Sequence, residues 1–133
     1  MIQLEDILEA YKNCRKNKRT KRSALSFEIN YAKECLKLTE ELNSRKYEIG
    51  VSSCFIVDKP KPREIFAANF RDRIVHHWLV MRLEPLFENI FIKDTYNCRK
   101  GKGTYYGVRR LKNKIEKISN NYTKTCYVAK FDM

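Results

Sequence analysis

Hydrophobic and polar positions follow two different periods along this chain. Over residues 47–57, apolar Tyr47, Ile49, Val51, Phe55 and Val57 fall on alternate positions, with only Ser53 and Ile56 breaking the pattern. A period of two is typical of a half-buried strand. The stretch Asp58-Lys-Pro-Lys-Pro62 then supplies a turn, and residues 63–67 return as a short second strand. The pattern predicts a β-hairpin over residues 47–67.

Elsewhere the apolar residues recur at spacings of three and four, which predicts helices near residues 2–17, 24–43, 71–90 and 104–119. The expected buried stripes, in chain order, are Leu4, Ile7, Leu8 and Tyr11; Leu25, Ile29, Ala32, Leu36, Thr39 and Leu42; Ile74, Val75, Trp78, Leu79, Arg82, Leu83 and Leu86; and Val108, Leu111, Ile115 and Ile118. We expect the second helix to pack beneath the hairpin. Pro85 interrupts the third stripe and predicts a kink or a restart there.

With the rest of the chain, these elements predict a mostly helical α+β fold with one antiparallel hairpin. Residues 91–98 are expected to be extended, and Thr104 is a candidate N-cap for the last helix. Residues 126–132 form a short apolar run that predicts a strand ending on Asp132. The length of 133 residues is natural for one domain.

Charge narrows the possible partners. The chain has 28 Lys and Arg against 16 Asp and Glu, a formal net charge of +12, which points to a polyanion such as nucleic acid or an anionic membrane surface. No apolar run approaches the roughly 18 residues of a membrane span, and the amphipathic, acidic start does not have the pattern of a signal peptide. The five widely spaced cysteines include no Cys-x-x-Cys pair, which argues against a zinc site and suits a reducing cytoplasm.

Two basic segments are candidates for anion binding. Lys59, Lys61 and Arg63 surround the two prolines of the hairpin turn, so they would form a stiff cationic tip able to grip phosphates. A solvated turn is the alternative, and composition alone favours it. The run from Lys12 to Arg22 holds seven Lys and Arg; a mobile solvated connection and a nucleic-acid contact both fit it.

Other motifs carry weaker signals. The loop Arg99-Lys-Gly-Lys-Gly-Thr104 leads into a helix N-terminus, which can hold an anion, yet it lacks the P-loop spacing and two glycines also serve any tight turn. His76 and His77 point in different directions around a helix, which favours a structural role for at least one of them. Asp132 alone cannot hold two Mg²⁺ ions, so by itself it reads as an ordinary terminal residue.

The order of five blocks adds a family resemblance. The blocks are Lys59-Pro-Lys-Pro-Arg63-Glu-Ile, Phe70-Arg-Asp-Arg-Ile-Val-His-His77, Leu83-Glu-Pro-Leu-Phe87, Asp94-Thr-Tyr-Asn-Cys-Arg-Lys-Gly-Lys-Gly-Thr104 and Tyr127-Val-Ala-Lys-Phe-Asp132. Over about residues 45 to 133, this order resembles the N-terminal half of bacterial reverse transcriptases, most closely the group with diversity-generating retroelement and group II intron enzymes.

The resemblance implies a fold and an activity. Residues 1–122 would form the fingers subdomain and residues 123–133 the first palm strand of an RNA-directed DNA polymerase. Lys59 and Arg63, and less closely Lys61, would contact the triphosphate of the incoming nucleotide. The block around Asp72 and Arg73 would be mainly structural. The nucleic-acid contacts would be Arg99, Lys100, Lys102 and Arg109.

The metal site follows from the same resemblance. Asp132 would be a catalytic Mg²⁺ ligand, joined by the main-chain carbonyl of Met133, in a two-metal nucleotidyl transfer. Its partners would be an RNA template, a DNA primer and deoxynucleoside triphosphates, with no membrane involved.

The chain departs from the family because the Tyr-x-Asp-Asp turn and the rest of the palm and thumb are missing from the sequence. We therefore expect a fragment that is inactive alone, does not bind Mg²⁺ stably, and has a palm strand that frays, docks on the hairpin or pairs with another copy. Two other function classes stay open: a stand-alone basic RNA-binding module, and a structural helical protein without salt-dependent RNA affinity.

Overall fold

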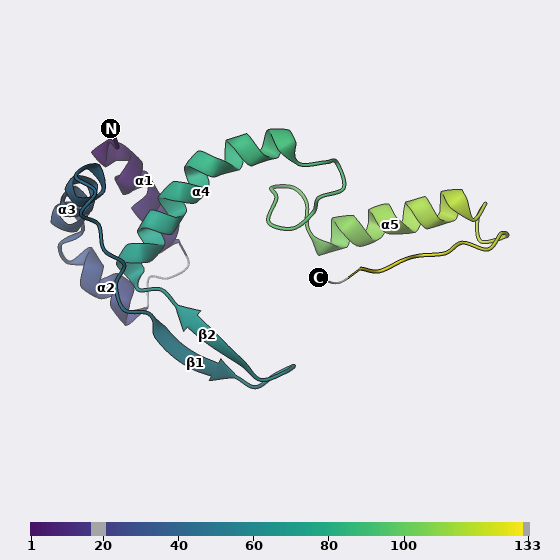
Figure 1. The fold of residues 1–133 in the computed structure, drawn as a ribbon, viewed down its shortest axis with the longest axis horizontal. Coiled ribbons are helices and arrows are strands. Elements are labelled where there is room, and N and C mark those ends of the chain that lie inside the picture. Colours follow the sequence, from purple (N-terminus) through teal and green to yellow (C-terminus); the bar gives the residue numbers. More distant parts are fainter. Residues whose placement is uncertain (17–20, 132–133) are drawn as a thin grey trace. The chain divides into compact units, whose positions relative to one another are not determined.

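A computed structural model describes residues 1–16 and 21–131. The described residues fall into two compact units, one before and one after the boundary between Asn89 and Ile90. The described elements are α1 (Leu4–Arg15), α2 (Arg22–Glu28), α3 (Tyr31–Asn43), β1 (Ser53–Val57), β2 (Arg63–Ala67), α4 (Phe70–Ile90) and α5 (Thr104–Ile118) (Figure 1). The mostly helical α+β expectation with one antiparallel hairpin is confirmed.

The core of the first unit lies between α1, α3 and the first half of α4. Ile7, Leu38 and Ile74, one from each helix, are fully buried. Tyr11 and Phe70 pack edge to face, with their ring centroids 6.3 Å apart, a spacing typical of aromatic pairs. The stripe predicted for the first helix is confirmed, because Ile7 and Tyr11 are buried and its other two residues pack against the core.

The single helix expected over residues 24–43 is wrong, because the chain forms α2 and α3 with a turn at residues 29–30. The turn rotates the two helices relative to each other, so a continuous stripe no longer faces one side. Leu25, Ile29 and Leu36 of the expected stripe are exposed, whereas Phe27 and Leu38 are buried. The main contacts of α3 are with α1 and α2, and its Glu41 pairs with Arg71 of α4, so α3 does not pack mainly beneath the hairpin as expected.

The hairpin is shorter than expected. Paired strands extend only over Ser53–Val57 and Arg63–Ala67, so residues 47–52 are not part of β1. The second strand has five residues, and all five pair with Ser53–Val57. The Tyr47 hydroxyl and the Gly50 N–H instead donate hydrogen bonds to the Asp72 carboxylate of α4. Figure 1 shows the ribbon projecting from the helices of its unit.

Helix α4 continues through Pro85 from Phe70 to Ile90, so the expected restart is absent. Pro85 removes one backbone donor, which would otherwise bond the carbonyl four residues earlier. Ile74 and Val75 are buried, but Leu79, Leu83 and Leu86 from the same predicted stripe are exposed. Only the first half of this helix therefore packs into the core of its unit.

The second unit consists of a loop, α5 and an irregular tail. Residues 91–103 form turns instead of the extended segment expected over 91–98, held by bonds such as Thr95 N–H to the Ile92 carbonyl. Gly103 occupies the N-cap position, so Thr104 is the first helical residue and not the cap. No residue of α5 is buried; Val108, Leu111 and Ile118 of the predicted seam are exposed, and Ile115 is partly buried.

The strand predicted over residues 126–132 is not formed in its described part. Residues 125–131 have no regular secondary structure, and within the described ranges β1 and β2 pair only with each other. The tail runs back in the direction of the start of α5 (Figure 1), while Tyr127 and Phe131 are almost wholly exposed. Across residues 1–16 and 21–131, no helix is both long and apolar enough to cross a membrane.

Candidate functional site

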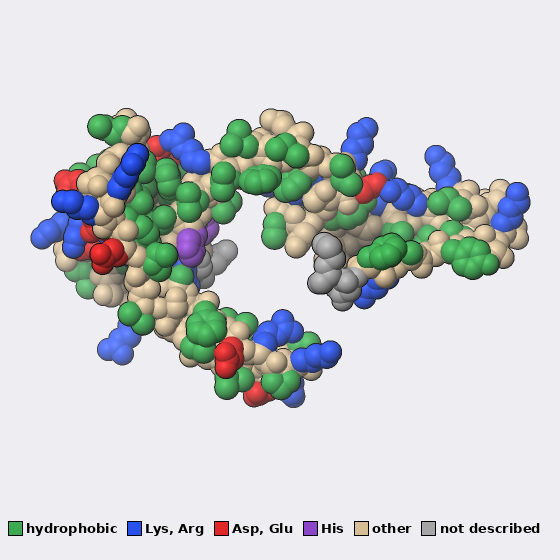
Figure 2. All heavy atoms as spheres, viewed as in Figure 1, with side chains coloured by type: hydrophobic (Ala, Val, Ile, Leu, Met, Phe, Trp, Pro, Cys, Tyr) green, Lys and Arg blue, Asp and Glu red, His purple; other side chains and the backbone are tan. Residues whose placement is uncertain are grey.

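The hairpin tip carries the first set of predicted site residues. Val57 pairs with Arg63, so Arg63 lies at the start of β2 on the same face as Phe55 and Ile65. Lys59 and Lys61 lie in the turn just before Arg63, and all three cations are exposed. Figure 2 shows Lys and Arg side chains gathered at this end of the ribbon. Among the described residues, no carboxylate forms an ion pair with any of the three.

Asp72 fixes the base of this ribbon. Its carboxylate, 0% exposed, accepts a hydrogen bond from the Tyr47 hydroxyl at 2.6 Å and another from the Gly50 N–H at 3.0 Å. Its own N–H donates to Asn69 Oδ1 at 2.9 Å in the first turn of α4, where the helix dipole also favours a negative charge. The chain entering the hairpin is therefore tied to the start of α4, which agrees with the structural role expected for this block.

Neighbouring groups strengthen this anchor. Burial, followed by the hydrogen bond to Asp72, raises the pKa of Tyr47 to about 12. The Arg71 guanidinium lies 5.3 Å from the centre of the Tyr47 ring and pairs with Glu41 of α3. A Cβ at Gly50 would lie 1.8 Å from Asn69 Nδ2, so any other residue here would have to displace the Asn69 side chain.

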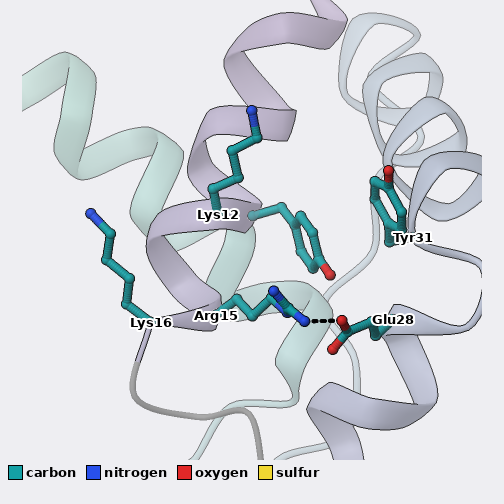
Figure 3. Close-up of a pocket in the computed structure, with 6 residues that line it drawn as sticks. Lys12, Arg15, Lys16, Glu28 and Tyr31 are labelled. Carbon is teal, nitrogen blue, oxygen red and sulfur yellow. Dashed lines mark hydrogen bonds and ion pairs between the residues drawn. The ribbon is translucent and has the colours of Figure 1, made fainter.

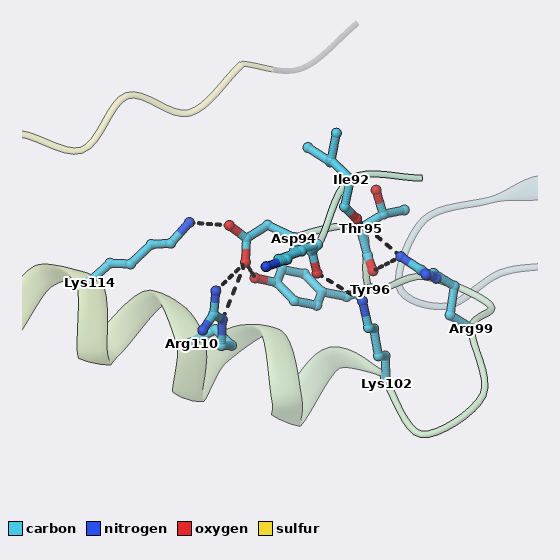
Figure 4. A network of polar contacts seen from close by, with 9 residues as sticks. Ile92, Asp94, Thr95, Tyr96, Arg99, Lys102, Arg110 and Lys114 are labelled. Carbon is cyan, nitrogen blue, oxygen red and sulfur yellow. Dashed lines mark hydrogen bonds and ion pairs between the residues drawn. The ribbon is translucent and has the colours of Figure 1, made fainter. Parts of the chain in front are cut away.

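The loop of the second unit holds two predicted cations by backbone carbonyls. Arg99 donates through Nη1 to the Ile92 carbonyl at 3.1 Å and also lies over the Phe91 ring, 5.2 Å from its centre. Lys102 Nζ donates to the Lys93 carbonyl at 2.8 Å (Figure 4). Both side chains shape the loop, and their nucleic-acid role stays a prediction.

Asp94 organises a network that the sequence analysis did not identify. Its Oδ1 accepts hydrogen bonds from the Tyr96 hydroxyl at 2.5 Å and from Arg110 Nη2 at 3.1 Å, and its Oδ2 pairs with Lys114 (Figure 4). These bonds, led by those from Lys114 and Tyr96, hold the pKa of the Asp94 carboxyl well below its usual range. The sequence held one signal for this network: Asp94 is the single acidic residue in the basic block 94–104, and Arg110 and Lys114 lie one helical turn apart on the helix that follows.

The other predicted nucleic-acid residues are exposed. Lys100 lies at the loop tip, and Arg109 lies on α5 outside the Asp94 network. The structure therefore ties Arg99 and Lys102 into the loop, while the side chains of Lys100 and Arg109 are exposed.

The predicted metal ligands Asp132 and Met133 lie outside the described residues. Within residues 1–16 and 21–131, no group of three or more His, Cys, Asp or Glu could hold a metal ion. The Lys12–Arg22 run is partly outside as well, at residues 17–20, while Lys12 and Arg15 belong to α1 and Arg22 begins α2.

Comparison with known proteins gives a limited likeness. No protein-family model matches the sequence. Over 80 residues, or 58% of the chain, the sequence is 30% identical to nuclear intron maturase 1 of Arabidopsis thaliana mitochondria, and the chain spans 11% of that protein's length. The likeness supports a reverse-transcriptase-related origin.

Proposed function

We propose that this chain supplies the fingers and the start of the palm of an RNA-directed DNA polymerase. In the assembled enzyme, the hairpin would close over a deoxynucleoside triphosphate while an RNA template directs its addition to a DNA primer. The observation that carries this proposal is a ribbon with a cationic tip, Lys59, Lys61 and Arg63, whose base is anchored through Asp72. The maturase likeness supports the same assignment.

The hairpin would act by positioning and charge compensation. Arg63 offers a planar fork that can bond two phosphate oxygens, whereas Lys59 and Lys61 act as point charges on flexible stems. An anchored base reduces the freedom that the tip loses when it binds the triphosphate, so more of the contact energy goes into binding.

Mg²⁺ would supply the charge stabilisation of nucleotidyl transfer. Asp132 and the Met133 carbonyl are hard oxygen ligands of the kind Mg²⁺ prefers. One carboxylate and one carbonyl are too few for two ions, and the described residues add no ligand group. We propose that further carboxylates complete the site in the assembled enzyme and that the 133 residues alone do not extend a primer.

Nucleic acid would contact the exposed cations of the second unit. Lys100 and Arg109 are placed at the surface, with Arg99 and Lys102 holding the loop from which Lys100 projects. We further propose a cytoplasmic retroelement enzyme, in which these contacts hold template and primer.

The test is primer extension by protein expressed from the complete gene, whatever its length, on an RNA template with labelled nucleotide and Mg²⁺. Lys59→Ala and Arg63→Ala are expected to raise the KM for nucleotide about tenfold or more, because each removes a phosphate contact. Asp132→Asn is expected to abolish incorporation. Lys33→Ala, an exposed change on α3, is the matched control and should leave the KM unchanged.

Absence of incorporation, or incorporation that survives Asp132→Asn, would contradict the polymerase proposal. A second candidate is a basic RNA-binding module without catalysis, which the net charge of +12 favours. That module predicts salt-dependent RNA binding with no incorporation in the same preparation.

A further inference from the structure

A cleft in the first unit lies apart from the hairpin and has a different lining. It has a volume of about 410 Å³ and lies between α1 and the segment that joins α2 to α3. This is within the range of small-ligand pockets, roughly 300–1,000 Å³. The lining residues, which define what we call the α1 cleft, are Tyr11, Lys12, Arg15, Lys16, Glu28 and Tyr31 (Figure 3).

The charge of the α1 cleft is positive after its own ion pair is counted. Arg15 pairs with Glu28, which offsets the one carboxylate in the lining. Lys12 and Lys16 are exposed and reach away from Glu28 in Figure 3. Lys16 Nζ donates a neutral hydrogen bond to Asn13 Oδ1 at 3.2 Å, and within residues 1–16 and 21–131 no carboxylate pairs with it. Two ammonium groups, one helical turn apart, are thus available to anions.

Arg15 has bonding capacity beyond this ion pair. Its Nε–H is enclosed and has no acceptor among the described residues. A buried donor without a partner is costly, so a ligand that draws the guanidinium into a new arrangement would gain an additional hydrogen bond.

An aromatic surface completes the lining. The rings of Tyr11 and Tyr31 are stacked, with centroids 5.2 Å apart and an angle of 9° between planes. Tyr11 is 5% exposed and belongs to the core, whereas Tyr31 is 45% exposed. The buried ring therefore braces the exposed one, which gives a flat, fixed surface of the kind on which nucleobases stack.

We infer that the α1 cleft binds a short stretch of single-stranded RNA, with one base on the outer face of Tyr31 and phosphates further along the strand on Lys12 and Lys16. The inference rests on the proposed function in taking RNA as the ligand. It adds a contact on the helices of the first unit, separate from the hairpin and from the loop of the second unit.

The test measures binding of a fluorescein-labelled single-stranded RNA to the full 133-residue chain over a series of salt concentrations. Lys12→Gln/Lys16→Gln is expected to weaken binding about tenfold at low salt and to lower the slope of log affinity against log salt by about 1.4, or roughly 0.7 per lost phosphate. The control Lys33→Gln/Lys46→Gln removes the same charge from exposed positions of the same unit and should have much smaller effects.

Tyr31 provides the second measurement. Tyr31→Ala is expected to weaken binding about 5- to 100-fold, while Tyr31→Phe keeps the ring and should bind normally. A 4-thiouridine RNA should crosslink to the Tyr31 peptide. The exposed lysine pair tests the inference independently of any folding defect in Tyr31→Ala.

The outcomes separate this inference from the proposed function. Equal losses in the Lys12/Lys16 pair and the Lys33/Lys46 pair, with crosslinks elsewhere, would overturn the α1 cleft alone. No RNA binding by the unmodified chain at low salt would overturn the cleft, while primer extension by the whole gene product would still stand as the separate test of the polymerase.

Discussion

Asp72 and Asp94 do similar work in the two units by different physical means. Each ties an irregular segment to a helix, but Asp72 is 0% exposed and accepts neutral donors, whereas the Asp94 side chain is 29% exposed and bonds Arg110 and Lys114. A buried carboxylate with neutral partners is little affected by salt, while an exposed ionic network is screened. The hairpin base is therefore a fixed joint, and the loop before α5 is an adjustable one.

Removing Asp72 should have the largest effect. Asp72→Ala leaves the Tyr47 hydroxyl and the Gly50 N–H without their acceptor, so the free energy of unfolding should fall by about 3 kcal/mol. Urea unfolding followed by the fluorescence of Trp78, the single tryptophan, measures it. Asp58→Ala, at an exposed position in the hairpin turn, is the control; an equal change in both variants would show that Asp72 is no anchor.

Gly50→Ala tests the same joint with less disruption. The new Cβ would lie 1.8 Å from Asn69 Nδ2, so Asn69 must move and its bond to the Asp72 N–H is weakened. We expect a loss of about 1–3 kcal/mol in the same urea assay. Gly103→Ala meets nothing within 4 Å and should be close to neutral. Normal stability of Gly50→Ala would mean that the joint tolerates the displacement.

Alkaline pH should weaken the first unit through Tyr47. Its pKa is raised from 10.0 to about 12, so the folded state keeps the phenol proton after the unfolded state begins to lose it. Stability from this group is present below pH 10 and is lost as the pH rises toward 12. Urea midpoints at pH 9 and pH 11.5 should differ more for the unmodified chain than for Tyr47→Phe. A parallel decline in both would exclude Tyr47 as the source.

The smallest effect is expected at Asp94. Its lowered pKa means that its contribution is present above the ordinary value of 3.8 and is lost as the pH falls below it. Asp94→Asn should speed amide hydrogen exchange in residues 94–96 at neutral pH, and high salt should reduce the difference from the unmodified chain. Glu116→Gln removes the exposed pair with Lys112 and should leave this loop unchanged. A difference that persists in high salt would contradict the ionic account.

Local signals in the sequence were enough to predict the hairpin turn and most of the helices. The prolines of the hairpin turn and the spacing of Ile7 and Tyr11 act within a few residues, and both features appear in the structure. The break between α2 and α3 has no glycine or proline to announce it, so periodicity alone extended one helix through Asn30.

Contacts between distant positions could not be predicted in the same way. Gly50 lies 22 positions before its partner Asp72, and Asp94 lies 20 before Lys114. Composition identifies Arg99 as a cation but not its partner, since the same guanidinium can bond a phosphate or, as here, a main-chain carbonyl. The order of motifs supplied the family resemblance, while the geometry of Asp132 lies outside the described residues.

A ribbon of two strands has two open edges, and this one also shows apolar side chains on both faces, with Phe55 on one and Phe66 on the other. Such a ribbon is a template for edge-to-edge association, which the mutual repulsion of like charges at its end opposes. Concentrated protein should therefore self-associate more readily as ionic strength rises, the reverse of the salt response expected for RNA binding. Purification in moderate salt at low protein concentration balances the two.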